Sequence, residues 1–571
     1  MSRMTLHRVT LGASLMALMA STLHAEPAPA LVAATTTFAD LTIAPGQIPA
    51  APAGKQLTLS VDGVELPLAP GHYTGAVTLS VTDDIPVNYH DVLKHNFRAG
   101  AYVQDGALVA GKSALATVTG ATITDGVIQN ARITSRAERF NGIIITGKGH
   151  YRLDHPVIEM TGNGGNDFAG YGAAITATGD AQLTIERPVI RTHGAIRTAV
   201  FVGGNATVHI NDADIEVLNG TLPADYTFTV DMGRMMEVPW MLGLSGNVRA
   251  TNLVGNGTVY YNRSHIRAQG WGAMSTDDST HVRMFVNDSL IEVTESGYGC
   301  YSIGDSIDTF TRSTIRAADI GCIMAAEGSV VFTEGTHVQS GRYGVMMHSG
   351  DGGGRLVIDK GSVMQSAQTA IQVKGLGTTI LVDGARVTAG NGILLQSMEN
   401  DDPFMKAMMR GEIPAGMLAP PPGVAAAAPK PKPSPDVLAT FRNTALVGDM
   451  FNARPTGSAM VLTFAGAQIT GRLSTATVVA AKGVEPTRAT LTEIGHVVNT
   501  PGAVAGGKGL KVSLDGASRW RVTGTSYLTD LTLAPGARLE AASGKLNLSV
   551  NGRKVAVKPG HYTGAIILRA E

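Results

Sequence analysis

The stretch VRMFVNDSLIEVTESGYGCYSIGDS, residues 282–306, contains the pattern that decides the fold. Two short runs alternate apolar and polar residues across a polar corner, and a third alternating run follows a turn that contains glycine. Alternation with a period of two is typical of β-strands that bury one face. The stretch therefore predicts three short strands joined by tight corners.

The same pattern recurs along much of the chain. It returns in DTFTRSTIRAADIGCIMAAEG (308–328), VVFTEGTHVQSGRYGVMMHSGDG (330–352), RLVIDKGSVMQSAQTAIQVKGLG (355–377) and TILVDGARVTAGNGILLQS (379–397). Three strands in about 22 to 27 residues suit a coil of parallel strands, in which each strand pairs with its equivalent in the next coil. Short polar side chains fall at the tight corner of each coil, where they can bond to neighbouring backbone and tolerate a left-handed conformation. These residues are Asn211, Asn262, Asn287, Asp359 and Asp383.

This arrangement resembles the right-handed parallel β-helix superfamily, in particular its pectate-lyase-like members, and the resemblance includes the asparagine ladder at the corner of that fold. The resemblance covers roughly residues 100–400 and resumes after 437, and it implies an all-β solenoid. Near the end, SLDGASRWRVTGTSYLTDLTLAPGARLEA (513–541) resembles the closing stack of pertactin-like autotransporter passengers. We expect the rod of such proteins here without their membrane barrel.

One segment occurs at both ends of the chain. PGHYTGA stands at 70–76 and again at 559–565, and the similarity extends so that 527–571 repeats 37–81. The ends of a solenoid expose an unpaired coil and need atypical terminal units. Two interpretations remain open: the copies cap opposite ends of the rod, or the termini meet as one small sheet module.

Composition and targeting signals place the chain outside the cytoplasm. A basic start and a short apolar run predict a signal peptide, and hence a periplasmic or secreted protein. No later apolar run is long enough to span a membrane, and the net charge of −1 gives no general attraction to nucleic acid. The expected segments are a signal peptide (1–25), an N-terminal β end segment (26–85), the parallel β-helix (86–398), a Met-rich then Pro/Ala-rich excursion (399–436), a β-helix continuation (437–526) and a C-terminal β end segment (527–571).

The two cysteines occupy equivalent places in consecutive coils, since 322 − 300 = 22 residues separate them. We expect Cys300 and Cys322 to be inward neighbours in a stack that also holds Ala273 and Val345. An exported protein can form a disulfide, but cross-strand geometry between parallel coils is often strained. A reduced ladder is therefore favoured over a disulfide.

Outward side chains on the strand after the glycine turn predict a functional face. Two columns are expected there: Met274, Tyr301, Ile323, Met346 and Gln372, and beside them Thr276, Ile303, Ala325, His348, Lys374 and Gln396. The similarity to pectate-lyase-like enzymes implies a substrate groove over this face. A long insertion at 221–240 supplies a wall for it, with Tyr226 and Trp240 joined by Trp271 and Tyr301 for stacking on sugar rings.

Charged residues near these columns suggest two chemistries. Asp278, Asp305 and Glu327 form an acidic flank that could hold calcium, with Lys374, Arg197 or His348 as the base of a polysaccharide lyase. Carboxylates one or two coils apart also match the separations used in glycoside hydrolysis. Against both stands ordinary turn chemistry, in which aspartates cap corners.

Two functions from different classes follow. The first is an exported carbohydrate-active enzyme, a lyase or hydrolase acting on a polysaccharide. The second is a non-catalytic adhesin or surface-binding rod. An enzyme needs its ionisable residues clustered beneath the 221–240 loop, whereas a rod scatters them along the coil.

Overall fold

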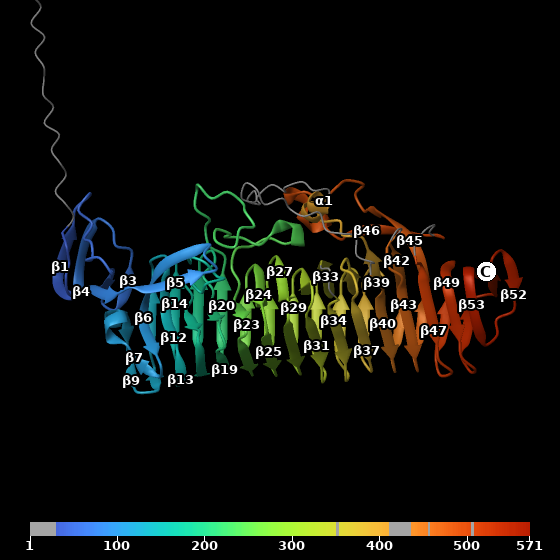
Figure 1. Cartoon of the computed structure of the whole chain (residues 1–571), viewed down its shortest axis with the longest axis horizontal. Helices are drawn as coiled ribbons and strands as arrows, with labels where there is room; N and C mark the ends of the chain where they lie inside the picture. The colour runs from blue at the N-terminus through green and yellow to red at the C-terminus, as the bar shows by residue number, and fades with distance from the viewer. Residues whose placement is uncertain (1–29, 350–352, 410–434, 455–456, 504–507) are drawn as a thin grey trace, which may run out of the picture.

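The computed structural model describes residues 30–349, 353–409, 435–454, 457–503 and 508–571. The predicted signal peptide and most of the Pro/Ala-rich stretch lie outside this part of the chain. The described residues form a long rod of short strands, most of them parallel to their neighbours in the next coil (Figure 1). The prediction of an all-β protein built from long sheets of parallel strands is confirmed.

Three sheets run the length of the rod. The first holds β1 (Thr36–Ile43), β2 (Lys55–Val61), β3 (Val64–Leu66), β4 (Gly71–Asp83), β8 (Val118–Thr119), β11 (Arg132–Ser135), β14 (Val157–Thr161), β17 (Val189–His193), β20 (Asp214–Leu218), β23 (His265–Ala268), β26 (Leu290–Val293), β29 (Thr314–Ala317), β32 (His337–Ser340), β35 (Val363–Ser366) and β38 (Arg386–Ala389), with a four-stranded sheet beyond it of β41 (Ala445–Val447), β44 (Gln468–Gly471), β48 (Arg519–Val522) and β50 (Arg538–Ala541).

The second sheet holds β9 (Thr122–Thr124), β10 (Val127–Gln129), β13 (Lys148–Asp154), β16 (Asp180–Glu186), β19 (Thr207–Asn211), β22 (Thr258–Asn262), β25 (Val282–Asn287), β28 (Ser306–Thr311), β31 (Ser329–Thr333), β34 (Arg355–Asp359), β37 (Thr379–Asp383), β40 (Val437–Arg442), β43 (Met460–Ala465), β47 (Leu510–Leu514), β49 (Ser526–Leu533), β51 (Leu546–Val550), β52 (Arg553–Val555) and β53 (Gly560–Ala570).

The third sheet holds β5 (Ile85–Tyr89), β6 (Leu93–Gln104), β7 (Ala107–Leu108), β12 (Phe140–Thr146), β15 (Ile175–Ala177), β18 (Val200–Val202), β21 (Thr251–Gly255), β24 (Trp271–Ser279), β27 (Gly297–Ile303), β30 (Ile320–Ala325), β33 (Val345–Ser349), β36 (Ile371–Val373), β39 (Ile393–Met398), β42 (Asp449–Ala453), β45 (Leu473–Ala480) and β46 (Val497–Pro501). Among the described residues, the helical elements are α1 (Pro403–Met409) and four 3₁₀ turns, η1 (Ala110–Lys112), η2 (Leu115–Thr117), η3 (Trp240–Leu242) and η4 (Arg488–Glu493).

Each coil passes from the second sheet to the first and then to the third, as β25, β26 and β27 do. Residues at equivalent places stand in register between coils, for example Ile291 beside Ile315. Alternate residues of β25 are buried, as its alternating pattern predicts. These inward side chains form one continuous apolar core along the rod. Its burial is the main stabilising contribution available to such a solenoid.

The corner ladder implied by the resemblance is present at the three asparagines, whereas Asp359 Oδ1 is buried without a hydrogen-bond partner among the described residues. The Asn262 side-chain amide donates to Asn211 Oδ1 at 2.9 Å, and that of Asn287 donates to Asn262 Oδ1 at 2.9 Å. The left-handed backbone lies one residue later, at Asp212 and Arg263, with φ of 54° and 50°. The ladder residues thus keep extended strand geometry, and the next residue makes the sharp bend.

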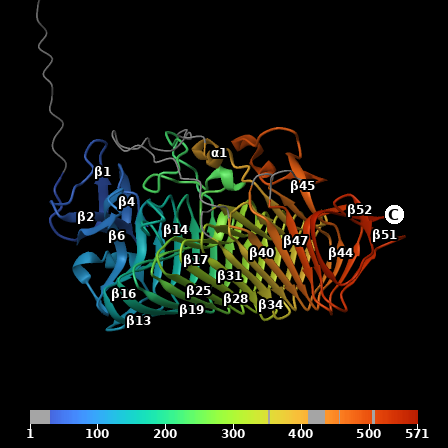
Figure 2. The ribbon, with the colours of Figure 1, turned by 45° about the vertical axis from the view of Figure 1, so that its right-hand side comes forward.

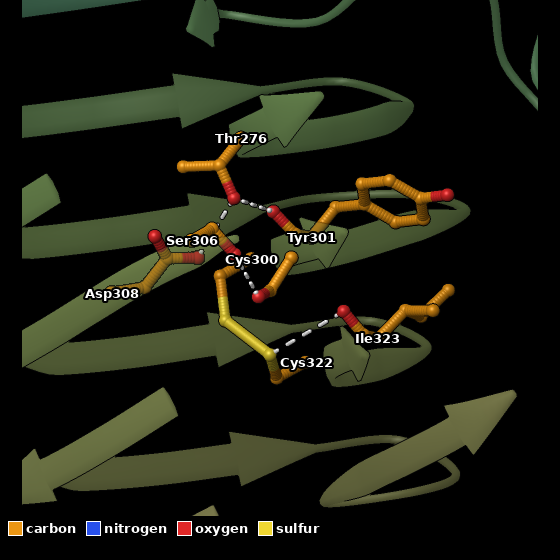
Figure 3. The surroundings of a disulfide bond; sticks show 8 residues. Thr276, Cys300, Tyr301, Ser306, Asp308, Cys322 and Ile323 are labelled. Carbon is orange, nitrogen blue, oxygen red and sulfur yellow. Dashed lines mark hydrogen bonds between the residues drawn. A yellow bond between two sulfur atoms is a disulfide. The ribbon is translucent and has the colours of Figure 1, made fainter. Parts of the chain in front are cut away.

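The expectation of reduced cysteines was wrong. Cys300 and Cys322 stand directly in register, with their Cα atoms 4.6 Å apart, and form a buried disulfide (Figure 3). The predicted stack was also misaligned by one residue at its start, because Met274 rather than Ala273 pairs with Cys300. Both side chains of the disulfide point into the coil, so the bond ties two consecutive coils together from within.

The duplicated segments lie at opposite ends of the rod (Figure 1). The N-terminal copy, residues 31–81, contains β1 to β4, and the C-terminal copy, residues 521–570, contains β49 and β51 to β53. We call them the N-module and the C-module. Their separation excludes the alternative in which the termini meet as one module.

A roof of loops covers part of the third sheet (Figures 1 and 2). It combines the 221–244 loop, α1 and the 482–496 segment around η4. The Arg488 guanidinium pairs with Glu237 at 2.7 Å, and Gln372 of β36 donates to the Gly495 carbonyl oxygen at 2.8 Å. No helix within the described residues is long and apolar enough to cross a membrane.

Candidate functional site

A cleft of about 620 Å³ lies between the 221–240 loop and the first coils of the rod. Its floor comes from β6, the turn before β12 and the loop after β14, and its wall comes from the insertion. The lining residues are Leu93, His95, Arg139, Gly165, Tyr171, Pro223, Asp225, Tyr226, Thr227, Phe228, Thr229, Gly233, Arg234 and Met236. The predicted wall is therefore present, and it faces the N-terminal coils.

Short hydrogen bonds hold the insertion in place. The Asn163 amide donates to the Thr221 carbonyl oxygen at 2.8 Å, and the Asn166 amide donates to that of Met232 at 2.6 Å. At the cleft itself the Met236 backbone N–H donates to the Tyr226 hydroxyl at 3.3 Å. The loop is thus pinned at both its start and its end, which gives the cleft a fixed shape.

Aromatic rings form much of the cleft floor. The Tyr171 ring stacks on Phe97 with centroids 4.2 Å apart and planes 6° from parallel. The His95 ring also lies beside Tyr171, with ring centroids 5.2 Å apart. Burial raises the pKa of the Tyr171 hydroxyl, and the nearby charge of Arg139 offsets this only in part. Tyr226 and Phe228 in the wall add two more rings suited to packing against a sugar.

Basic groups outnumber acidic ones among the lining residues. Arg139 and Arg234 are exposed and line the cleft together with His95, whereas Asp225 is the one carboxylate of this lining. Asp231, just behind the wall, pairs with Arg234 at 2.8 Å. A cleft with two guanidinium groups and several rings is chemically suited to an anionic, ring-containing ligand.

A buried ionic network supports the coil beside the cleft. Arg249, 1% exposed, donates to Asp167 at 2.8 Å and to Asp277 at 2.7 Å. Its guanidinium also lies 4.7 Å from the Phe168 ring and 4.6 Å from the Trp271 ring. Trp271 is 2% exposed and so cannot stack on a ligand from solvent. The role predicted for Trp271 in substrate binding is therefore wrong, and its ring instead packs around a buried cation.

The predicted acidic flank is dispersed. Asp278 accepts hydrogen bonds from the Tyr89 hydroxyl at 2.8 Å and pairs with His90 at 2.7 Å. Asp305 pairs with His281 at 2.8 Å, and this hydrogen bond, with Arg283 nearby, lowers the pKa of its carboxyl. Each acid is thus held by a local basic partner.

The predicted calcium site does not form. Glu327 is exposed on its own turn. Across the part of the chain that the structure describes, no group of three or more His, Cys, Asp or Glu side chains is arranged to hold a metal ion. The three acids of the flank were aligned on turns of unequal length, so their side chains do not converge.

Arg197 is a structural residue. Its side chain is fully buried and donates to five backbone carbonyl oxygens, including those of Gly162 at 2.8 Å and Phe140 at 2.8 Å. Burial lowers the pKa of its guanidinium to about 10. The proposal that Arg197 acts as a base on a substrate is contradicted, because a fully buried group bonded on all sides cannot reach one.

His348 and Lys374 meet acidic partners under the roof. His348 lies 3.2 Å from Asp402, and the Lys374 ammonium lies 2.6 Å from Asp401. The charge of Lys374 lowers the pKa of Asp401 against the opposing effect of burial. Both basic side chains are nearly inaccessible to solvent. The predicted outward columns were therefore placed on a face that the 399–409 and 482–496 segments cover.

The remaining predicted aromatic residues take separate places. Tyr226 lines the cleft as expected. Trp240 begins η3 and is half-buried outside the lining, while Tyr301 stacks on Tyr298 with centroids 5.3 Å apart. Of the nine residues proposed for catalysis or substrate binding, only Tyr226 reaches the cleft.

The repeat pattern did not predict the floor residues His95, Arg139 and Tyr171. They come from three different segments that precede the clear repeats, so no spacing rule connects them. The one available signal was the concentration of aromatic and basic residues between 89 and 98. Comparison with known proteins finds no matching family model and no matching curated protein.

Proposed function

We propose that this chain is an exported, right-handed parallel β-helix protein that binds an acidic polysaccharide in the cleft under the 221–240 loop. The observation that carries the proposal is the lining of that cleft, which contains the rings of Tyr171, Tyr226 and Phe228 together with the basic side chains of His95, Arg139 and Arg234. Sugar rings pack on aromatic faces, and uronate carboxylates pair with guanidinium groups. The signal-peptide pattern supports a periplasmic or secreted location.

The same groups support elimination better than hydrolysis. The Arg139 guanidinium, with Arg234 beside its partner Asp231, can pair with a uronate carboxylate, which acidifies the proton on the adjacent carbon. His95 is the base that could accept this proton. The bond to the leaving sugar oxygen then breaks as a carbon–carbon double bond forms, and water protonates that oxygen. Hydrolysis needs two carboxylates, whereas the described lining holds Asp225 alone.

Calorimetric titration with polygalacturonate, alginate and neutral dextran tests the binding. We expect the two acidic polymers to bind and dextran not to. Arg139→Gln and Tyr226→Leu should each weaken binding by about 10-fold or more, the cost of one lost charged hydrogen bond or packed ring. Arg386→Gln, exposed on β38 away from the cleft, is the matched control. Absence of binding to any acidic polymer would refute the proposal.

Ultraviolet absorbance of unsaturated products tests the reaction. The wild-type protein should release such products, and His95→Gln should abolish the release while retaining binding. Binding without turnover in the wild-type protein would instead support the second candidate, a non-catalytic adhesin. The dispersal of the predicted acidic flank into local ion pairs favours that alternative.

A further inference from the structure

The N-module and C-module share one strand pattern down to its irregularities. β1 pairs antiparallel with β4, and β49 pairs antiparallel with β53, with Asp40 opposite Thr74 in one and Asp530 opposite Thr563 in the other. Both pairings have a bulge just before that aspartate. Both modules also contain the same hairpin, formed by β2 and β3 or by β51 and β52. The two modules are therefore similar in structure as well as in sequence.

The sequence similarity between the two modules begins before their first strands, β1 and β49. VAATTTFADLTIAPG (32–46) aligns with VTGTSYLTDLTLAPG (522–536). The isolated parallel bridge between Leu31 and Ala50 matches the parallel pair of Arg521 and Glu540, since both members differ by 490 residues. Residues 30–32 thus occupy the position that the last coil strand, β48, occupies beside the C-module.

The two copies use their apolar faces differently. In the C-module, Leu531, Leu548 and Ile566 belong to the continuous core of the coil, which they close. The equivalent residues of the N-module, Leu41, Leu59 and Val77, belong to a separate cluster whose described members all come from residues 32–81. The N-module therefore carries a coil-closing face that closes no coil of its own.

Only a thin cover lies over this face. Leu531 is fully buried against the coil, whereas its counterpart Leu41 is half-exposed. The cover consists of the chain around Val32 and Ala51. Leu31 and Ile48, in the same cover, are 65% and 41% exposed. Exposed apolar residues clustered at one tip indicate a contact surface.

An unused strand edge accompanies the face. In the C-module, β49 pairs in parallel with the coil strand β47, with Asp530 opposite Lys511. Its counterpart β1 pairs with β4 alone among the described residues. β1 retains the matching aspartate, Asp40, and the matching apolar residues. The surface therefore offers the same strand edge and the same apolar positions that close the coil at the other end of this chain.

We propose that two copies of this chain join head to tail, with the N-module of one replacing the C-module on the coil end of the other. β1 of the first copy then pairs with β47 of the second, and Asp40 stands opposite Lys511. This is an exchange of equivalent elements, the usual basis of domain swapping, and a head-to-tail contact of this kind propagates into a chain of subunits.

The opposite exchange, in which the C-module of one copy replaces the N-module of another, is disfavoured. β3 docks on the first coil through Glu65, which is buried and accepts hydrogen bonds from the Ser135 hydroxyl at 2.7 Å and the Ala137 backbone N–H at 3.2 Å. The C-module has Lys554 in place of Glu65. A lysine cannot accept these bonds, and a charged residue on an exposed edge opposes pairing. The free edge of β52 is thus protected, and the assembly has one direction.

Disulfide trapping tests the exchange in the full-length protein. Thr42 and Ser513 are exposed or half-exposed, and Ser513 stands opposite Thr532 within one chain. The variant Thr42→Cys/Ser513→Cys should give covalent dimers and higher species whose yield rises with protein concentration, and mass spectrometry should find β1 joined to β47. Thr532→Cys/Ser513→Cys should give monomers with an internal link. Lys360→Cys/Ser513→Cys, with an exposed site on the coil, measures random linkage.

Matched alanine variants then separate exchange from simple aggregation. In the trapping background, Leu531→Ala should raise the linked fraction, because it loosens the resident C-module, with the exchange constant shifting by about 10-fold or more. Leu41→Ala should lower the linked fraction. An increase with both variants, a yield equal to that of the Lys360 control, or equal linkage from Thr42→Cys alone would each overturn the proposal.

Discussion

Removing the cation of Arg249 is expected to destabilise the coils under the cleft strongly. Arg249 and Asp167 are 1% and 0% exposed, and their hydrogen bond is 2.8 Å long. The variant Arg249→Met keeps much of the side-chain volume between the Phe168 and Trp271 rings but leaves the Asp167 carboxylate buried without its partner. Breaking a buried ion pair in this way costs about 3 to 5 kcal/mol of unfolding free energy.

A double variant distinguishes charge from packing. In Arg249→Met/Asp167→Asn the fully buried carboxylate is removed, and only Asp277, whose side chain is 17% exposed, still lacks its partner. We therefore expect the double variant to recover part of the stability lost in Arg249→Met. Arg312→Met is the matched control, because Arg312 pairs with Asp288 at 2.7 Å but both are about half exposed. Loss of such a surface pair costs at most about 1 kcal/mol.

Native-state hydrogen exchange is the appropriate assay, because coils of a solenoid open locally and a single unfolding midpoint averages over them. Amides of β18, β21 and the 163–172 loop should lose protection in Arg249→Met, whereas amides of β47 should not. The reasoning is refuted if Arg249→Met costs no more than Arg312→Met, or if adding Asp167→Asn lowers stability further.

Three further outcomes are expected. Burial raises the pKa of Asp308, so the contribution of this carboxyl group to stability is lost as pH rises. Asp308→Asn should therefore raise the melting temperature more at pH 8 than at pH 4. An equal rise at the two pH values would contradict this prediction. Replacing Cys300 and Cys322 together by alanine should lower the unfolding free energy by about 3 kcal/mol, as expected for opening a loop of this size. Adding reductant to this variant should cause no further loss. A stability equal to that of the oxidised wild-type protein would contradict this prediction. Lys374 lowers the pKa of Asp401, so the pair stabilises the roof above about pH 4 and this stabilisation is lost as pH falls. Hydrogen exchange at the Gly495 amide should show this pH dependence in the wild-type protein and not in Asp401→Asn. The same exchange profile in both proteins would count against this prediction.

The fold was largely predictable because each coil repeats the same local rule. Alternation sets which side chains point inward, and equivalent residues then stack at one strand spacing. The corner positions of Asn211, Asn262 and Asn287 followed from this rule, and the resemblance to parallel β-helices implied the ladder that they form. The state of Cys300 and Cys322 did not follow, because adjacency in a stack does not reveal whether the two sulfur atoms face each other closely enough to bond.

The candidate site was mostly unpredictable for the opposite reason. Its parts obey no repeat: Tyr171 and Tyr226 come from loops, and Arg139 comes from a turn. The predicted columns failed at His348 and Lys374 because Asp402 and Asp401, from a segment later in the chain, pair with these side chains, and the 482–496 segment covers the same face. An alternating sequence shows that one face of a strand points away from the core. It cannot show whether that face is exposed to water or covered by another layer of protein.

The amino-acid sequence by itself determined the period, the inward and outward faces of each strand, the corner positions and the presence of two equivalent end modules, since all of these depend on local spacing. Only the tertiary structure decided which face is roofed, where a cleft remains open and how each end module meets its coil. The reason is that long-range packing joins residues such as Glu237 and Arg488, whose contact no local pattern encodes. The same difference separates the two copies of PGHYTGA, because one closes a coil and the other presents the same face at the tip of the rod.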